Sequence, residues 1–350
     1  MYNLVIQAME RGLVPDFAIR MGIRKLCRDR LRSISQKDEM LLNEKVLEYV
    51  EQLKKSPLAP EAHKANEQHY ELPSEFFHLV LGKNKKYSSA YYSDPDTTLD
   101  KAEDIALQET IHRVEIKDGM SILELGCGWG SLTLAMARKF PKSKIVALSN
   151  SQPQRLYIEE RCQSEGLQNV QILTRNIENV ENLAEEFGLF DRVVSVEMFE
   201  HLRNYELLLH RISSWLKPEG KLFVHIFTHK NSPYLFEVEG EDNWMGKYFF
   251  TGGQMPSQSL FSYFQKDLKL TKQWLWNGTH YSKTSEDWLK NLDQKKPEVM
   301  EIFKKTYGEK DAGRWFHRWR IFFLSCAELF GFDKGEEWGV SHYLFVKKSN

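Results

Sequence analysis

Residues 121–130 read SILELGCGWG, an apolar run that breaks into a glycine-rich turn. A strand, a tight glycine turn and a helix in this order form the nucleotide-binding end of open α/β sheets. A dinucleotide site has the spacing G-x-G-x-x-G, and Ser131 stands where its third glycine would be. Glu124, just before the turn, would repel a diphosphate and attract a cation. The stretch therefore favours S-adenosylmethionine over a dinucleotide as cofactor. The glycines of the turn are Gly126, Gly128 and Gly130.

Short β-rich runs alternate with amphipathic helical patterns from about residue 100 to 230. This alternation predicts an α/β fold with a parallel sheet covered on both faces. We expect a helical extension over 1–60, a cofactor-binding core over 61–230, and over 231–350 a substrate cap together with the closing part of the core. Long helical patterns cover 284–306 and 311–330. The strand-like runs are SILEL, KIVALS, VQILT, DRVVSVE, KLFVHIF and a final SHYLFVKK.

Composition excludes several classes of protein. Lys and Arg total 48 against 49 Asp and Glu, so the chain has no basic surplus for a nucleic-acid backbone. Its four cysteines show no paired ligand spacing, which indicates reduced thiols in the cytoplasm rather than disulfides or structural zinc. Neither a secretory leader nor a run of about 20 apolar residues for an integral membrane segment is expected.

The following strand ends should complete the cofactor pocket. LSNSQPQ follows the second strand, where Asn150 and Gln152 could bind ribose hydroxyls through neutral hydrogen bonds. TRNIEN follows the third strand, where Asn176 could meet the adenine amino edge and Ile177 could cover the ring. The alternative for each residue is a solvated loop position.

Two carboxylates and an imidazole, Glu197, Glu200 and His201, follow the fourth strand in SVEMFEHLRNY. Methyl transfer to an amine requires a free lone pair aligned with the methyl carbon, and an ammonium has none. His201, or a carboxylate whose pKa is raised by burial, could take the proton near neutral pH. Glu197 could also hold the cation by charge. These three residues are our catalytic candidates.

Motifs in the same order resemble the cyclopropane-fatty-acyl-phospholipid synthase superfamily of methyltransferases. They are HYELPSEFFHLVLG, KYSSAYY, ELGCGWGSLTL, EMFEHLRNY, YFFTGGQMPS and CAELF. Within it, DNWMGKYFFTGGQMPS and HYSKTSEDWLKNLD resemble the coclaurine N-methyltransferase-like group most closely. The resemblance implies a Rossmann-like, class I fold with a mostly parallel seven-stranded sheet, and N-methylation of an aromatic amine such as a benzylisoquinoline alkaloid. It also implies cofactor contacts from Tyr87, Ser88, Gly126 to Gly130 and Gln152, and carries over Glu197, Glu200 and His201.

The alternative activity is cyclopropanation or C-methylation of a lipid. The lipid enzymes resemble this chain at Glu200 and at His225, where the matching residues help to bind bicarbonate as the base. They use a tyrosine in the helix before the CA pair, where this chain offers Phe322 or Phe323. Glu197 replaces a small residue of theirs, and an added anion suits an amine better than bicarbonate. These differences from the lipid enzymes favour methylation of an amine nitrogen over modification of a lipid.

Aromatic residues are dense in the last third of the chain and could enclose an aromatic amine or stack on a cation. His225 and His229 are four apart in HIFTH, but their β-branched and aromatic context predicts a strand end and no metal site. A homodimer through the N-terminal helices is a further expectation. The substrate-binding candidates are Tyr70, Glu71, His225, Trp319, Phe322 and Phe323.

Overall fold

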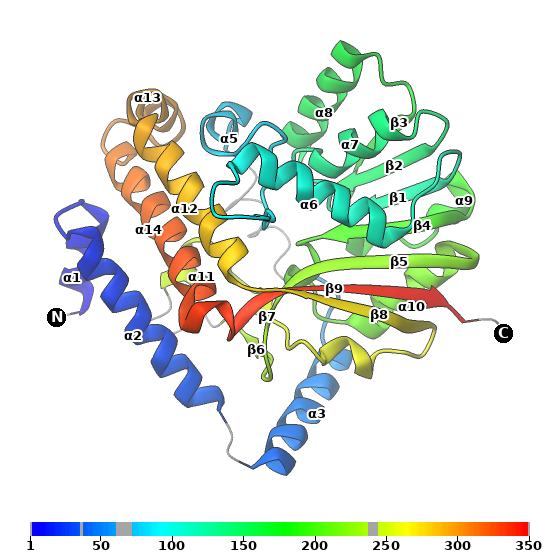
Figure 1. Cartoon of the computed structure of the whole chain (residues 1–350), viewed down its shortest axis with the longest axis horizontal. Helices are drawn as coiled ribbons and strands as arrows, with labels where there is room; N and C mark the ends of the chain where they lie inside the picture. The colour runs from blue at the N-terminus through cyan, green and yellow to red at the C-terminus, as the bar shows by residue number, and fades with distance from the viewer. Residues whose placement is uncertain (1, 36–37, 61–71, 237–243, 349–350) are drawn as a thin grey trace.

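A computed structural model describes residues 2–35, 38–60, 72–236 and 244–348. These residues form a seven-stranded sheet in the order β3-β2-β1-β4-β5-β9-β8, with a separate pair β6-β7 (Figure 1). Strands β1 to β5 are parallel, whereas β9 is antiparallel to both β5 and β8. The predicted fold class and mostly parallel sheet are confirmed. The strands are β1 (Ser121–Leu125), β2 (Lys144–Ser149), β3 (Val170–Thr174), β4 (Phe190–Val196), β5 (Leu216–His229), β6 (Tyr234–Leu235), β7 (Gln254–Met255), β8 (Leu268–Trp276) and β9 (Trp338–Lys347).

Helices cover both faces of the sheet because successive side chains of a strand point to opposite sides. On β1, Leu123 joins a core with Leu53 and Leu208, while Ile122 packs with Leu107 and Met136 on the other face. The α-helices are α1 (Tyr2–Glu10), α2 (Asp16–Ile34), α3 (Glu39–Lys55), α5 (Ser74–Val80), α6 (Leu99–Val114), α7 (Ser131–Lys139), α8 (Gln152–Glu165), α9 (Leu183–Phe187), α10 (Tyr205–Trp215), α11 (Trp244–Tyr248), α12 (Thr279–Gln294), α13 (Lys296–Tyr307) and α14 (Ala312–Phe330).

The helical pattern predicted over 284–306 is two helices rather than one. Helix α12 ends at Gln294, and α13 begins at Lys296 with Pro297 in its first turn. Proline has no N–H for the helix hydrogen bond and clashes with the preceding turn, so it fits a helix start but not a helix interior. The second pattern, over 311–330, corresponds to α14.

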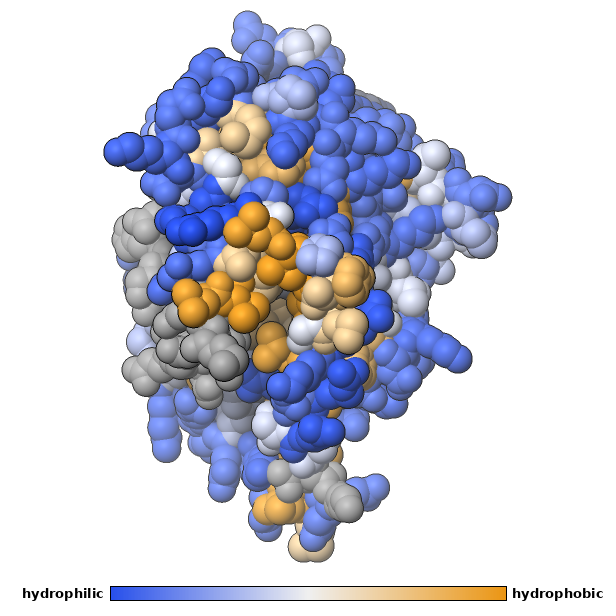
Figure 2. All heavy atoms as spheres, turned by 90° about the vertical axis from the view of Figure 1, so that its left-hand side faces the viewer, coloured by the Kyte–Doolittle hydropathy of each residue, from blue (hydrophilic) through white to orange (hydrophobic). Residues whose placement is uncertain are grey.

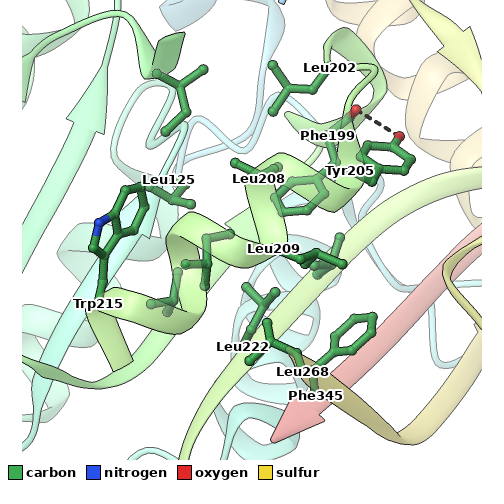
Figure 3. Close-up of a cluster of buried hydrophobic side chains, with 14 of the residues drawn as sticks. Leu125, Phe199, Leu202, Tyr205, Leu208, Leu209, Trp215, Leu222, Leu268 and Phe345 are labelled. Atoms are coloured by element: carbon green, nitrogen blue, oxygen red, sulfur yellow. Dashed lines mark hydrogen bonds between the residues drawn. The ribbon is translucent and has the colours of Figure 1, made fainter. Parts of the chain in front are cut away.

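The turn after β4 is anchored by the core beneath it. This turn is the short 3-10 helix η2 (Phe199–His201), which contains two of the catalytic candidates. Phe199 is fully buried, and its carbonyl accepts a hydrogen bond of 2.9 Å from the Tyr205 hydroxyl of α10 (Figure 3). Packing below the turn thus fixes where Glu200 and His201 lie.

Gly278, between β8 and α12, offers a test of this packing. A Cβ here would lie 2.0 Å from the Trp338 carbonyl oxygen and 2.3 Å from that of Phe330. Because both atoms are backbone, Gly278→Ala should lower the free energy of unfolding by about 2–3 kcal/mol, as overpacking does. Urea unfolding followed by circular dichroism measures the loss.

Gly22→Ala is the matched control. Gly22 lies in α2 with nothing within 4 Å of an added Cβ, so alanine should stabilise the protein by about 0.5–1 kcal/mol. Equal stability of the two variants would contradict the close approach of β9 and α14 to Gly278.

Candidate active site

A pocket lies where the strand order reverses, at the carboxyl ends of β1, β2, β3 and β4. Open α/β sheets bind ligands at this place. Ten of the predicted site residues line it, brought together from segments more than 100 residues apart. They are Tyr87, Ser88, Glu124, Gly126, Gly128, Asn150, Asn176, Ile177, Glu197 and His201.

The glycine turn supplies the floor. Gly128 has a φ of +53°, and a Cβ added there would meet nothing within 4 Å, so open space lies beside its backbone. Gly130, expected to bind the cofactor, lies outside the lining. A Cβ on Gly130 would come within 2.7 Å of Ile158, so this glycine lets α7 pack closely against α8.

Glu124 lies buried behind the turn, 2% exposed, and accepts a hydrogen bond of 2.5 Å from the Thr133 hydroxyl. Burial raises the pKa of its carboxyl to about 8, and the Thr133 hydrogen bond acts in the opposite sense. A cation bound nearby would favour the carboxylate form. The sequence predicts that Glu124 attracts a cation and repels a diphosphate. Whether Glu124 carries the charge for this depends on what occupies the pocket.

After β2, the structure replaces one predicted contact with another. Gln152 is the first residue of α8, is exposed and does not line the pocket. Gln154, two positions later, is buried in the lining, where its Oε1 accepts a hydrogen bond of 2.8 Å from the Ser149 hydroxyl. Its Nε2 has no hydrogen-bond partner among the described residues. A buried donor of this kind fits a ligand hydroxyl.

Tyr87, Ser88, Asn176 and Ile177 close two sides of the pocket. The Ser88 hydroxyl accepts a hydrogen bond of 2.6 Å from the buried Lys86 ammonium, whose pKa burial lowers to about 8. Asn176 caps the short 3-10 helix η1 (Ile177–Asn179) by accepting the Glu178 N–H at 3.0 Å. All four residues line the pocket, as expected for cofactor contacts. Their roles in binding the cofactor stay predictions.

Glu197 is held in a strained and crowded position. It is not a glycine, yet its φ is +46°, a left-handed conformation that costs free energy. Its side chain is 7% exposed. Oε1 accepts the Ser89 N–H at 3.0 Å and lies 3.1 Å from His225 Nε2, and Oε2 accepts the Tyr281 hydroxyl at 2.6 Å. Burial raises the pKa of Glu197, opposed by the Lys86 charge and by these hydrogen bonds.

Glu200 and His201 share one buried turn but face different surroundings. His201 lines the pocket, and its ring stacks on Phe250 with centroids 5.0 Å apart. Burial lowers the pKa of His201 to about 4, against the charge of Glu197. Glu200 is 1% exposed and does not line the pocket, and its Oε2 has no hydrogen-bond partner among the described residues. Burial and the nearby Glu197 raise the pKa of Glu200 well above its usual range.

Most of the substrate-binding candidates lie away from this pocket. His225 is fully buried on β5 behind Glu197, so it contacts that carboxylate instead of lining the cavity. Trp319, Phe322 and Phe323 are buried in the aromatic core around α14 and are not in the lining. Tyr70 and Glu71 lie outside the described residues.

Two side chains in contact with the site were not singled out from the sequence. Tyr281 donates to Glu197 from α12, and Lys86 donates to Ser88 and to the Ser89 carbonyl. Both belong to quoted motifs, Tyr281 to HYSKTSEDW and Lys86 to KYSSAYY as its first residue, but nothing in their spacing pointed to the pocket. His225 and His229 do lie on a strand, as predicted.

Comparisons with known proteins converge on one family. Residues 59–336 match the family model described as mycolic acid cyclopropane synthetase. (S)-coclaurine N-methyltransferase of Papaver somniferum is 40% identical over 348 residues, which cover 98% of both chains. Pavine N-methyltransferase of Thalictrum flavum subsp. glaucum is 36% identical over 98% of this chain and 96% of its own.

Solved structures agree with these sequences. A crystal structure of coclaurine N-methyltransferase, bound to N-methylheliamine and SAH, matches with a TM-score of 0.94 and 37% identity, over 98% of this chain and 99% of that one. A cyclopropane synthase from Mycobacterium tuberculosis matches with a TM-score of 0.69 at 22% identity, over 83% of this chain and 100% of that one, and so shares the fold.

Proposed function

Because the chain belongs to the mycolic acid cyclopropane synthetase family, among its S-adenosylmethionine-dependent N-methyltransferases, we propose that it methylates the amine nitrogen of a benzylisoquinoline-type alkaloid. The observation that carries this substrate class is the buried carboxylate of Glu197 in the lining of the pocket. A carboxylate there stabilises a cationic nitrogen. The relatives named for coclaurine, pavine and tetrahydroprotoberberine support an aromatic amine of this kind.

The pocket fits S-adenosylmethionine. Gly128 leaves room for its amino acid and ribose parts, Gly126 lies beside it in the lining, and Glu124 lies where it can balance a positive charge. The unpartnered Gln154 Nε2 suits a ribose hydroxyl, and Asn176 with Ile177 suits the adenine. When bound, the cofactor supplies an electrophilic methyl group on a positively charged sulfur.

Glu197 binds and orients the amine. Its carboxylate accepts from the Ser89 N–H and the Tyr281 hydroxyl and lies against His225, so it cannot turn away from a cation that enters the pocket. A charge fixed before the substrate arrives needs little reorganisation during the reaction. The strain at Glu197 is consistent with this role.

Glu200 takes the proton from the ammonium form of the substrate by way of His201, which lines the pocket whereas Glu200 does not. His201 is uncharged at neutral pH because its pKa is about 4, so the imidazole accepts a hydrogen bond and does not repel the cation. Glu200 has a raised pKa and therefore holds a proton more firmly than an exposed carboxylate. We therefore assign Glu200 as the final acceptor of the substrate's proton and His201 as the hydrogen-bond acceptor that faces the substrate.

Lipid methylation is the less favoured candidate. The family model and the structurally similar cyclopropane synthase belong to lipid enzymes by name. In this chain, however, the resemblance aligns Phe322 or Phe323 with the tyrosine of the lipid enzymes, and Glu197 adds an anion to the pocket. In the described part of the chain, no helix has the length and apolar character of a transmembrane span.

The substrate class is tested with labelled S-adenosylmethionine. We expect transfer of label to benzylisoquinoline amines, detected as a mass gain of one methyl, and none to unsaturated phospholipid vesicles. The opposite result would replace the proposed function by the lipid reaction. Cofactor binding without transfer to either class would indicate a binding protein instead of an enzyme.

The proton acceptors are tested by Glu200→Ala and His201→Ala. Each should lower kcat by about a hundredfold or more, as loss of a general base does. Affinity for S-adenosylhomocysteine, measured by calorimetry, should stay within about twofold because neither residue belongs to the predicted cofactor contacts. His229→Ala is the control, since His229 is also buried with a pKa of about 4 but does not line the pocket. Loss of cofactor binding in the first two variants would overturn the assignment.

A cytoplasmic location remains part of the proposal. All four cysteines, Cys27, Cys127, Cys162 and Cys326, are free thiols in the structure. Free thiols are typical of proteins in reducing compartments.

A homodimer through the N-terminal helices also remains a proposal. Leu13, Phe17 and Met21 follow one another at intervals of four and are 72%, 68% and 63% exposed. Figure 2 shows hydrophobic side chains gathered near the middle of the side that carries α1 and α2. Exposed apolar patches of this kind mark interaction sites, and a second copy would present the same row.

Light scattering coupled to gel filtration tests the dimer. We expect twice the chain mass of 41.2 kDa for the unaltered protein and the single mass for the double variant Phe17→Glu, Met21→Glu. Leu156→Glu, on α8 and 55% exposed, should leave the mass unchanged. A monomeric unaltered protein would refute the proposal.

A further inference from the structure

A hydrogen-bonded row of side chains crosses the sheet from Glu197 to the outer helix α6. His225 Nε2 of β5 lies 3.1 Å from Glu197 Oε1, and His225 Nδ1 lies 2.8 Å from His342 Nε2 of β9. His342 Nδ1 in turn lies 2.7 Å from Arg113 Nη1. We call these three residues, Arg113, His342 and His225, the relay. Both histidines are fully buried.

The outer end of the relay determines the direction of every hydrogen bond in it. A guanidinium has only donors, so Arg113 donates and His342 Nδ1 accepts. A neutral imidazole carries one proton, which must then be on His342 Nε2, and this N–H donates to His225 Nδ1. By the same step, the proton of His225 is on Nε2 and points to Glu197. Burial keeps both histidines neutral, since it lowers the pKa of each well below the usual range.

Arg113 is well placed to act as the fixed end. Its side chain is 14% exposed, and its guanidinium lies over the rings of Trp274 and Trp276 at 5.2 and 5.4 Å. Glu109, one turn earlier on α6, forms an ion pair with it at 3.4 Å. Stacking and charge thus hold the guanidinium against His342.

We propose that Arg113 is a positioning residue for methyl transfer, which acts through His342 and His225 to keep an N–H donor on Glu197. This proposal rests on the proposed function of Glu197 in holding the amine. If His225 had its proton on Nδ1, its Nε2 lone pair would face the carboxylate and repel it. The relay prevents that tautomer. Together with the Ser89 N–H and the Tyr281 hydroxyl, it surrounds the Glu197 carboxylate with hydrogen-bond donors only.

The tautomers can be measured directly. Protein with ¹⁵N-labelled histidine should show both His225 and His342 as neutral Nε2–H forms in long-range proton–nitrogen spectra, with peaks assigned by single His→Asn variants. In Arg113→Met, which removes the donor, the Nδ1–H form should appear at one or both residues. A Nδ1–H form in the unaltered protein, or no change in Arg113→Met, would overturn the proposal.

Kinetics test whether the tautomers matter. Arg113→Met should lower kcat for the amine by about tenfold, the effect of losing a hydrogen bond to a charged group, while the affinity for S-adenosylhomocysteine changes by less than about twofold. Rates are divided by the number of binding-competent sites from calorimetry, which removes any effect of partial unfolding. An unchanged kcat would refute the role of Arg113.

Glu109→Gln is the matched control, because it removes the ion pair but leaves the Arg113 donor in place. It should preserve both tautomers and kcat. An equal loss of kcat in Arg113→Met and Glu109→Gln would show that the charge on α6 causes the effect, and this would overturn the proposed role of the relay. The spectra require no substrate, so failure to methylate any amine would refute the proposed function without touching the tautomer result, and altered tautomers would refute only the relay.

Discussion

A carboxylate held inside the protein by hydrogen-bond donors is the constraint around which this site is built. Glu197 is nearly buried, adopts a left-handed backbone and accepts from an amide and a hydroxyl while a histidine faces it. A buried charge is costly unless it is paired, so each of these contacts compensates for lost hydration. The contacts do not fully replace the lost hydration of the carboxylate, so a cation that enters the pocket stabilises it further. The same arrangement can therefore bind an amine.

The donors come from parts of the chain that only the complete fold brings together. Ser89 precedes the sheet, His225 lies on its fifth strand and Tyr281 belongs to a helix of the C-terminal part. The core beneath η2 fixes the neighbouring turn, and the close passage of the backbone at Gly278 fixes the start of α12. Stability and chemistry are therefore linked, because loosening α12 removes one donor from Glu197.

The sequence was sufficient where the fold depends on a local pattern. The glycine turn, the strands around it and the cluster of Glu197, Glu200 and His201 follow from spacing along the chain, and the sheet they predict is the one observed. Local pattern failed where side-chain direction matters: Gln152 starts a helix and faces solvent, while Gln154 reaches the pocket. The local pattern also could not reveal that His225 contacts His342. The two histidines are 117 positions apart, and their contact depends on the antiparallel register of β5 and β9.

The position of β9 has a consequence for synthesis. This strand lies between β5 and β8, so the sheet has a gap until residues 338–347 are inserted into it. A nascent chain can form β1 to β5 and the cofactor end of the pocket while still attached to the ribosome. It cannot place His342 behind His225 until residues 338–347 have left the exit tunnel, so the contact between the two histidines is among the last to form.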